Sequence, residues 1–128
     1  MHEPPTVSHM YETISWRAYI RATDRPSAER VVSRLGVQLD RAVRIDSYER
    51  YWKIPEFAEM RLTSPLQRSA PETALLSALR SAWRIATPWT LNTPGPADDF
   101  EAIASATAGS HFLVPGIEWM QFRISAHS

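Results

Sequence analysis

The chain has 128 residues, 44% of them hydrophobic, and it contains no cysteine. One domain of roughly 100–200 residues accounts for this length, and the lack of cysteine excludes disulfides, thiolate catalysis, iron–sulfur clusters and cysteine-ligated zinc. The formal net charge is zero, with 14 basic and 14 acidic residues, so the chain lacks the basic excess typical of nucleic-acid-binding domains.

The two ends of the chain are expected to lie outside the fold. We predict a flexible N-terminal segment over residues 1–11, a single α+β domain over 12–125 and a flexible tail over 126–128. No apolar run approaches the roughly 20 residues of a membrane helix, and the first residues lack the apolar centre of a signal peptide. These features predict a cytoplasmic protein with no membrane partner.

The first predicted elements are a strand and a helix. Residues 13–22 alternate between apolar and polar side chains, which is typical of a strand with one buried face. Asp24 is a candidate N-cap, Pro26 suits a first helical turn, and Gly36 suits a helix end. Together these signals predict a helix over 26–35.

Two further strands follow. Residues 42–53 read as the second strand, although the aromatic side chains near its end do not keep one parity. This loss of alternation indicates either a bulge near 49–50 or the end of the strand there. Residues 56–63 alternate again and predict a third strand, joined to the second as a hairpin.

An amphipathic helix is predicted over 71–86. Ser69 and Glu72 have the spacing of a capping box, and leucine, alanine and tryptophan recur at helical spacing behind them. We expect this stripe to pack on the sheet. Trp16, Trp83 and Trp119 all fall on faces that the pattern assigns to burial.

The last predicted elements complete a fold class. A short strand over 89–91 is followed by a helix over 98–108, which Asp98 caps and Gly109 ends, and by a strand over 116–125. The order β-α-β-β-α-β predicts an α+β protein with a ferredoxin-like split βαβ core, extended by a C-terminal helix and strand. Helices would cover one face of its sheet.

Motifs for catalysis or for a cofactor are missing from the sequence. Three of the four histidines lie near the chain ends, and His111 has no partner at metal-ligand spacing. With four glycines, the sequence holds no phosphate loop and no dinucleotide fingerprint. We therefore predict no metal and no cofactor. The acidic group of Asp98, Asp99 and Glu101 is interpreted as helix capping.

The most suggestive segment is YERYW, residues 48–52. Exposed tyrosine, tryptophan and arginine are the residue types that dominate protein-binding hot spots. The alternative is a bulged strand that buries two of these aromatic side chains, and the sequence leaves both open. If they are exposed, the acidic group steers a basic partner toward them. The candidate partner-binding residues are Tyr48, Arg50, Tyr51, Trp52, Lys53, Asp98, Asp99 and Glu101.

In its size, its lack of active-site signatures, the YERYW segment and the closing GIEWMQFRIS strand, the chain resembles the small cytoplasmic immunity proteins of bacterial polymorphic toxin systems. The resemblance implies binding to a cognate toxin domain and blocking of its active site, without catalytic residues. Immunity proteins against basic nucleases are strongly acidic, so the zero net charge argues against a nuclease target.

Two other functions remain open at this point. One is a cofactor-free enzyme or ligand-binding protein of the dimeric α+β barrel type, which rests on fold analogy alone and would make the chain a homodimer. The other is an RNA-binding module, since residues 17–53 combine arginines with aromatic side chains. The balanced net charge argues against nucleic acid.

Overall fold

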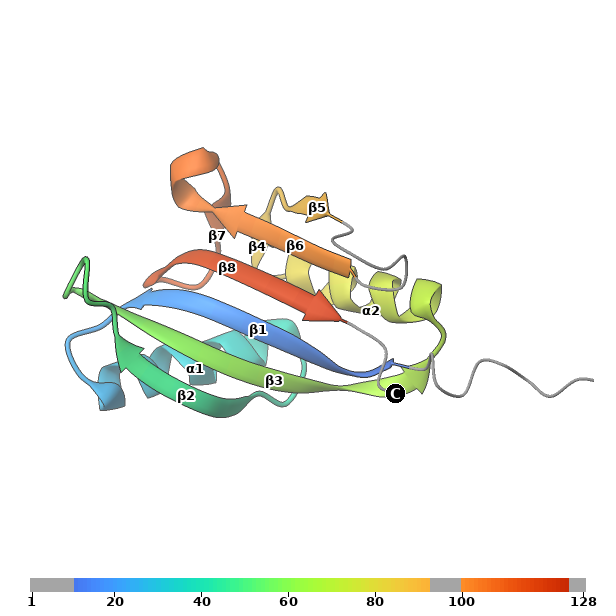
Figure 1. The fold of residues 1–128 in the computed structure, drawn as a ribbon, viewed down its shortest axis with the longest axis horizontal. Coiled ribbons are helices and arrows are strands. Elements are labelled where there is room, and N and C mark those ends of the chain that lie inside the picture. Colours follow the sequence, from blue (N-terminus) through green and yellow to red (C-terminus); the bar gives the residue numbers. More distant parts are fainter. Residues whose placement is uncertain (1–10, 93–99, 125–128) are drawn as a thin grey trace, which may run out of the picture.

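A computed structural model describes residues 11–92 and 100–124. Its main feature is a six-stranded antiparallel sheet in the order β2-β3-β1-β8-β6-β5 (Figure 1). The strands of this sheet are β1 (Tyr11–Arg21), β2 (Arg44–Arg50), β3 (Phe57–Ser69), β5 (Thr90–Asn92), β6 (Phe100–Ser105) and β8 (Ile117–Ile124).

Smaller elements complete the described chain. The helices are α1 (Arg25–Leu39) and α2 (Pro71–Trp83), and a short 3₁₀ turn, η2, spans Ala106–Ala108. A second sheet has two short strands, β4 (Ala86–Thr87) and β7 (His111–Phe112). None of the helices in the described ranges is long and apolar enough to cross a membrane.

Strand β1 lies at the centre of the sheet, as its alternating pattern allows. Its apolar side chains are buried, and it pairs with β3 along one side and with β8 along the other. The predicted hairpin is also confirmed, because β2 pairs with β3. Strand β2 ends at Arg50, and its one register shift lies earlier, between Ile45 and Ser47, so a bulge at 49–50 is not the explanation.

Helix α1 begins where its sequence signals predict. The side chain of Asp24 accepts a hydrogen bond from the backbone N–H of Ser27 at 2.9 Å. A hydrogen bond from the Ser27 side chain first, and this backbone bond second, lower the pKa of the Asp24 carboxyl. The helix runs past Gly36 and ends at Asp40, which has a φ of 57°. The predicted end at 35 is therefore wrong by one turn.

Helix α2 packs on the sheet through a face that only partly matches the expected one, since Ala82 is buried and Leu75 and Leu79 pack partly buried against the core. Its buried residues are small, namely Ala74, Ala78, Ser81 and Ala82. Leu76 is 60% exposed and Trp83 is 63% exposed, so the expected burial of Trp83 is wrong. The predicted capping box is also absent, because Ala70 precedes the helix and makes no side-chain bond to it.

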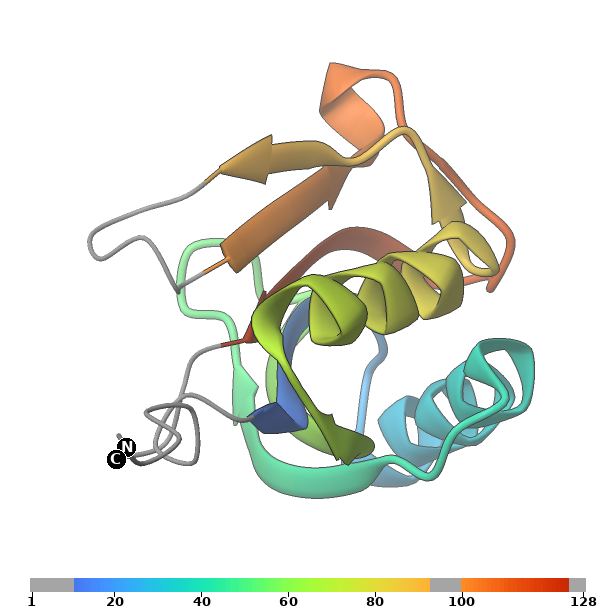
Figure 2. The same cartoon turned by 90° about the vertical axis from the view of Figure 1, so that its right-hand side faces the viewer.

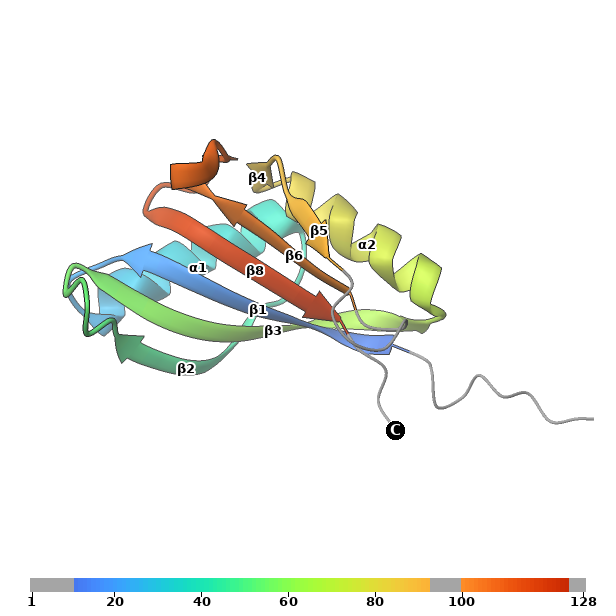
Figure 3. The same cartoon turned by 45° about the horizontal axis from the view of Figure 1, so that its top comes forward.

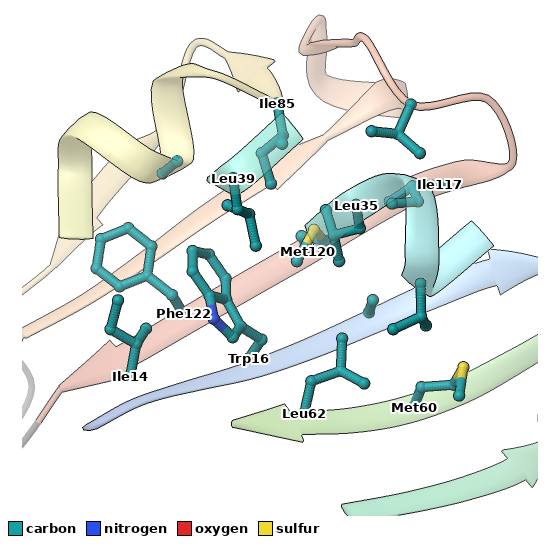
Figure 4. Close-up of a cluster of buried hydrophobic side chains, with 14 of the residues drawn as sticks. Ile14, Trp16, Leu35, Leu39, Met60, Leu62, Ile85, Ile117, Met120 and Phe122 are labelled. Atoms are coloured by element: carbon teal, nitrogen blue, oxygen red, sulfur yellow. The ribbon is translucent and has the colours of Figure 1, made fainter. Parts of the chain in front are cut away.

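Both helices lie on the same side of the sheet (Figures 2 and 3). The core fills the space between them and the strands, and Figure 4 shows Trp16, Met60, Leu62, Met120 and Phe122 from the three central strands meeting there. All five of these side chains are at most 2% exposed. This arrangement leaves the opposite face of the sheet without a covering layer in the described residues.

The predicted fold class is wrong. Over residues 11–92 and 100–124 the structure has two α-helices on a six-stranded antiparallel sheet, with 49% strand against 29% helix, and it is not the ferredoxin-like arrangement expected. The region predicted as a C-terminal helix over 98–108 is strand β6 from Phe100 to Ser105, followed by η2. Pairing with β8 imposes the extended conformation on β6, because it satisfies the backbone groups of both strands.

Candidate functional site

The uncovered side of the sheet, called the open face here, is built from the polar residues of the same strands that bury apolar ones. On β1 these are Ser15, Arg17, Tyr19 and Arg21. In the rows of neighbours that cross these four positions, charge is balanced. With Asp46 at the β2 register shift, which accepts from Thr63, and Glu118, which pairs with Arg21, the charged side chains there are five arginines and five carboxylates: Arg17, Arg21, Arg44, Arg61, Arg123, Asp46, Glu49, Glu59, Glu101 and Glu118.

Four aromatic rings form a continuous row at one end of the open face. The ring centroids of Trp119 and Tyr19 lie 5.0 Å apart, those of Tyr19 and Tyr51 lie 4.9 Å apart, and those of Tyr51 and Trp52 lie 6.5 Å apart. We call these four residues the aromatic row. The guanidinium of Arg17 lies 5.6 Å from the Tyr19 ring centroid and 5.5 Å from that of Trp119, which is within cation–π range.

The row ends on the turn between β2 and β3, residues 51–56, which reaches beyond the ends of β1 and β8 at the left of Figure 1. Arg50 holds this turn, since its guanidinium donates to the carbonyl oxygens of Pro55 at 2.7 Å and of Thr23 at 2.6 Å. The turn presents Trp52, which is 79% exposed, and Ile54, which is 44% exposed. Its aromatic tip is therefore held in place and faces solvent.

Two of the hollows on the open face adjoin the aromatic row or Arg17. One, of about 220 Å³, lies beside the aromatic row and is largely apolar; Tyr19, Tyr51, Ile54, Phe57 and Trp119 line it together with Ser105, Thr107 and Glu118. The other, of about 390 Å³, is polar and lies further along the strands; its lining includes Ser15, Arg17, Asp46, Arg61, Gln121 and Arg123. Arg17 borders the polar hollow and also touches the aromatic row.

Arg17 is fixed by several contacts at this junction. It donates to Glu59 at 2.6 Å and to the hydroxyl of Tyr19 at 2.8 Å. Burial by itself lowers the pKa of Arg17, but the Tyr19 hydrogen bond and the negative charge of Glu59 outweigh burial and raise the pKa. The guanidinium therefore stays charged at any physiological pH.

The residues predicted around YERYW separate into two groups. Tyr51, Trp52 and Lys53 lie on the exposed turn, with the Lys53 ammonium 5.2 Å from the Trp52 ring centroid. Tyr48 packs partly buried against the core, and Arg50 is used to hold the turn. Trp52 is exposed, as the first reading expects, whereas the bulge that would bury two of the aromatic side chains is not present and only Tyr48 packs, partly buried, against the core.

Of the predicted acidic group, Glu101 lies on the open face but away from the aromatic row. Glu101 is on β6 opposite Arg123, four residues along the strand from Ser105, which faces Trp119. At about 3.3 Å per residue, Glu101 lies roughly 13 Å along the sheet from the aromatic row. Asp98 and Asp99 lie outside the described residues.

Sequence reasoning missed Arg17, Tyr19, Arg61 and Trp119 as site residues. A signal for Tyr19 was present, because it shares a parity with arginines on the polar side of β1. For Trp119 the expected burial is wrong: it shares the open face with Gln121 and pairs with Tyr19. A register shift between β1 and β8 beside Tyr19 keeps Ile117 in the core nevertheless.

No group of three or more potential metal ligands occurs among residues 11–92 and 100–124. His111 lies on the short strand β7, where it is paired with Thr87. Comparisons of the chain with protein-family models, with curated proteins and with solved structures gave no significant match. The functional interpretation therefore rests on the open face itself.

Proposed function

We propose that this protein acts by binding another protein through the aromatic row and the β2–β3 turn. The observation that carries the proposal is Trp52, which is 79% exposed at the tip of a turn that Arg50 holds in place. Tryptophan, tyrosine and arginine dominate the energetics of protein interfaces. A side chain that is already ordered loses less entropy on binding than a mobile one does.

Two observations favour a protein over a single-stranded nucleic acid as the partner. Bases bind such surfaces by stacking on free ring faces, but Tyr19 is packed between Tyr51 and Trp119, and Lys53 lies over Trp52. The arginines of the open face are also matched by an equal number of carboxylates. Affinity for a polyanion would need an excess of positive charge.

The resemblance to immunity proteins supplies the finer proposal, in which the partner is a bacterial toxin domain and binding blocks its active site. The shape of the turn supports this. It reaches past the ends of β1 and β8 at the left of Figure 1, and it carries Trp52, whose side chain is 79% exposed. Enzyme active sites are concave, and a rigid apolar tip suits insertion into a cleft.

The test compares two exposed tryptophans on different elements of the fold. Trp52 lies on the turn, and Trp83 lies on α2 in the helix layer with 63% exposure. A photo-crosslinking amino acid placed at position 52, and separately at 83, in the native strain would identify the partner by mass spectrometry. We expect a specific crosslinked protein from position 52 only.

Affinity is then measured with the purified partner. Trp52→Ala should weaken binding by at least about thirtyfold, equivalent to about 2 kcal/mol for a central hot spot. Trp83→Ala should change it by less than about twofold, and both variants should keep the wild-type circular dichroism spectrum. If the partner is a toxin, the wild-type protein should abolish its activity at equimolar ratio. Equal effects of the two substitutions would contradict the proposed surface.

A further inference from the structure

The register of the sheet places two like charges side by side on the open face. Arg17 of β1 and Arg61 of β3 are directly opposite each other. Arg123 is opposite Ser15, and is therefore a diagonal neighbour of Arg17. Directly opposed like charges destabilise an antiparallel pair unless counter-charges compensate them.

The compensation on the described chain is incomplete. One oxygen of the Glu59 carboxylate serves both guanidinium groups, at 2.6 Å from Arg17 and 3.7 Å from Arg61. Glu59 lies on the side of the aromatic row and does not line the polar hollow. Among the ion pairs of the described residues, one carboxylate is thus shared by two guanidinium groups, and the Arg61 side chain is 62% exposed.

The polar hollow lies on the other side of this arginine pair. It exists because Ser15 is short, while the longer side chains of Arg17, Arg61, Gln121 and Arg123 surround it. Three guanidinium groups and the single carboxylate of Asp46 line it. That carboxylate is already engaged: the Thr63 hydroxyl donates to it, as does Arg44 at 2.8 Å.

The same bonds keep Asp46 negative. The hydrogen bond from Thr63 first, and the bond to Arg44 and its charge next, lower the pKa of the Asp46 carboxyl. The lining of the hollow therefore holds an excess of positive charge with a fixed negative charge at its edge. Both the attraction to the guanidinium groups and the repulsion from Asp46 grow with the charge of a bound anion, so the choice of a carboxylate rests on the partner being a protein, whose anionic side chains are carboxylates.

We propose that the polar hollow binds a carboxylate, supplied by an aspartate or glutamate side chain of the partner protein. The source of the carboxylate rests on the proposed function, and the site itself rests on the arginine pair. A guanidinium can bind a carboxylate with two parallel hydrogen bonds, and a bound anion offsets the repulsion between Arg17 and Arg61. Since Arg17 also touches the aromatic row, the partner presents an acidic side chain beside an apolar one.

The test uses a pair of small probes that differ by one charge. N-acetyl-glutamic acid α-amide carries one carboxylate, and N-acetyl-glutamine amide is its neutral counterpart. Each is titrated at constant ionic strength while the arginine Nε–Hε resonances are followed by NMR. We expect saturable shifts at Arg17 and Arg61 with the charged probe and none with the neutral one.

Three variants locate the site. Arg61→Gln should weaken the charged probe at least fivefold, whereas Arg30→Gln, on the exposed side of α1, and Trp52→Ala should leave its affinity unchanged. Arg61→Gln should also leave the free energy of unfolding unchanged or raise it, because it removes the like-charge pair. Equal responses to both probes, or an unaffected Arg61→Gln variant, would overturn the proposal.

Two further titrations decide the ligand class. Inorganic phosphate that binds tenfold more tightly than the charged probe would make the hollow a phosphate site. An oligouridine that shifts the same resonances at lower concentration would make it a nucleic-acid site. Either result would overturn the carboxylate assignment. If the charged probe does not bind but Trp52→Ala still weakens binding of the partner, the carboxylate site is wrong and the proposed function stands. If the probe binds but Trp52→Ala does not weaken binding of the partner, the proposed function is wrong and the site stands.

Discussion

A buried hydrogen bond joins two central strands at the level of single residues. The indole N–H of Trp16 on β1 donates to the hydroxyl of Ser64 on β3 at 3.0 Å, and Trp16 is 2% and Ser64 0% exposed. The indole thus fills the core with its rings while its polar atom is satisfied. A buried donor left without an acceptor would incur the full desolvation penalty.

Removal of the Ser64 hydroxyl should therefore be costly for so small a change. Ser64→Ala is expected to lower the free energy of unfolding by about 1–3 kcal/mol, because it leaves the Trp16 N–H buried and unpaired. Ser33→Ala, on the exposed side of α1, is the matched control and should stay within about 0.5 kcal/mol of wild type. Urea denaturation measures both. Equal stabilities for the two variants would show that water reaches the indole.

At the scale of elements, α2 shows how a strong periodic signal can be misread. Leucine repeats at helical spacing along 75–79, and these residues predict the existence of the helix correctly. The fully buried positions, however, are alanines and a serine, since small side chains let the helix axis approach the sheet, while Leu75 and Leu79 pack only partly buried beside them. From hydrophobicity alone, leucine would be expected to be buried before alanine. The close distance between the helix and the sheet, which favours alanine, cannot be read from a single sequence.

The close packing of α2 leads to a prediction that runs against hydrophobicity. Ala78 is 0% exposed, so Ala78→Leu should overpack the core and lower the free energy of unfolding by about 1–3 kcal/mol. Leu76→Ala removes a side chain that is 60% exposed and should change stability by less than about 0.5 kcal/mol. Thermal and urea denaturation test the pair. A larger loss for Leu76→Ala would mean that the leucine face is the buried one.

Strand β6 marks the other limit of sequence-based prediction. Alanine at 102 and 104 and the acids before it are typical of a helix, and they led to the wrong assignment. These alanines also alternate with Ile103 and Ser105, which is the spacing of a strand, and the pairing with β8 decides between the two. Local propensity loses here to a long-range contact, so the fold class derived from it was wrong as well.

At the scale of the whole molecule, the strand order makes β1 the centre of the sheet. It is paired on both sides, whereas β2 and β5 are edges of the six-stranded sheet. The open face follows from the same order, since it joins Arg17 and Tyr19 to Trp119 from the far end of the chain. The turn residues Tyr51 and Trp52 could be found from sequence because they are adjacent; their partners Tyr19 and Trp119 required the register.

The sheet order predicts where the chain opens last. In native-state hydrogen exchange, the amides of Trp16, Ala18 and Ile20 on β1 should exchange only through global unfolding, with the same free energy as denaturation. Amides of the edge strand β5 should exchange at least a hundredfold faster. Exchange of the β1 amides by local opening would contradict the central place of this strand.

Arg50 donates a hydrogen bond to the carbonyl oxygen of Thr23 and so holds the β2–β3 turn. Its role is therefore different from that of the exposed residues on the turn. Positions 52–54 carry exposed side chains outside the core, so they are free to diverge under selection for a new partner without loss of folding. Arg50 holds the backbone of the turn on which these positions lie. Under the proposed function, a new partner could be recognised through changes at these few exposed positions, while Arg50 keeps the backbone of the turn in place.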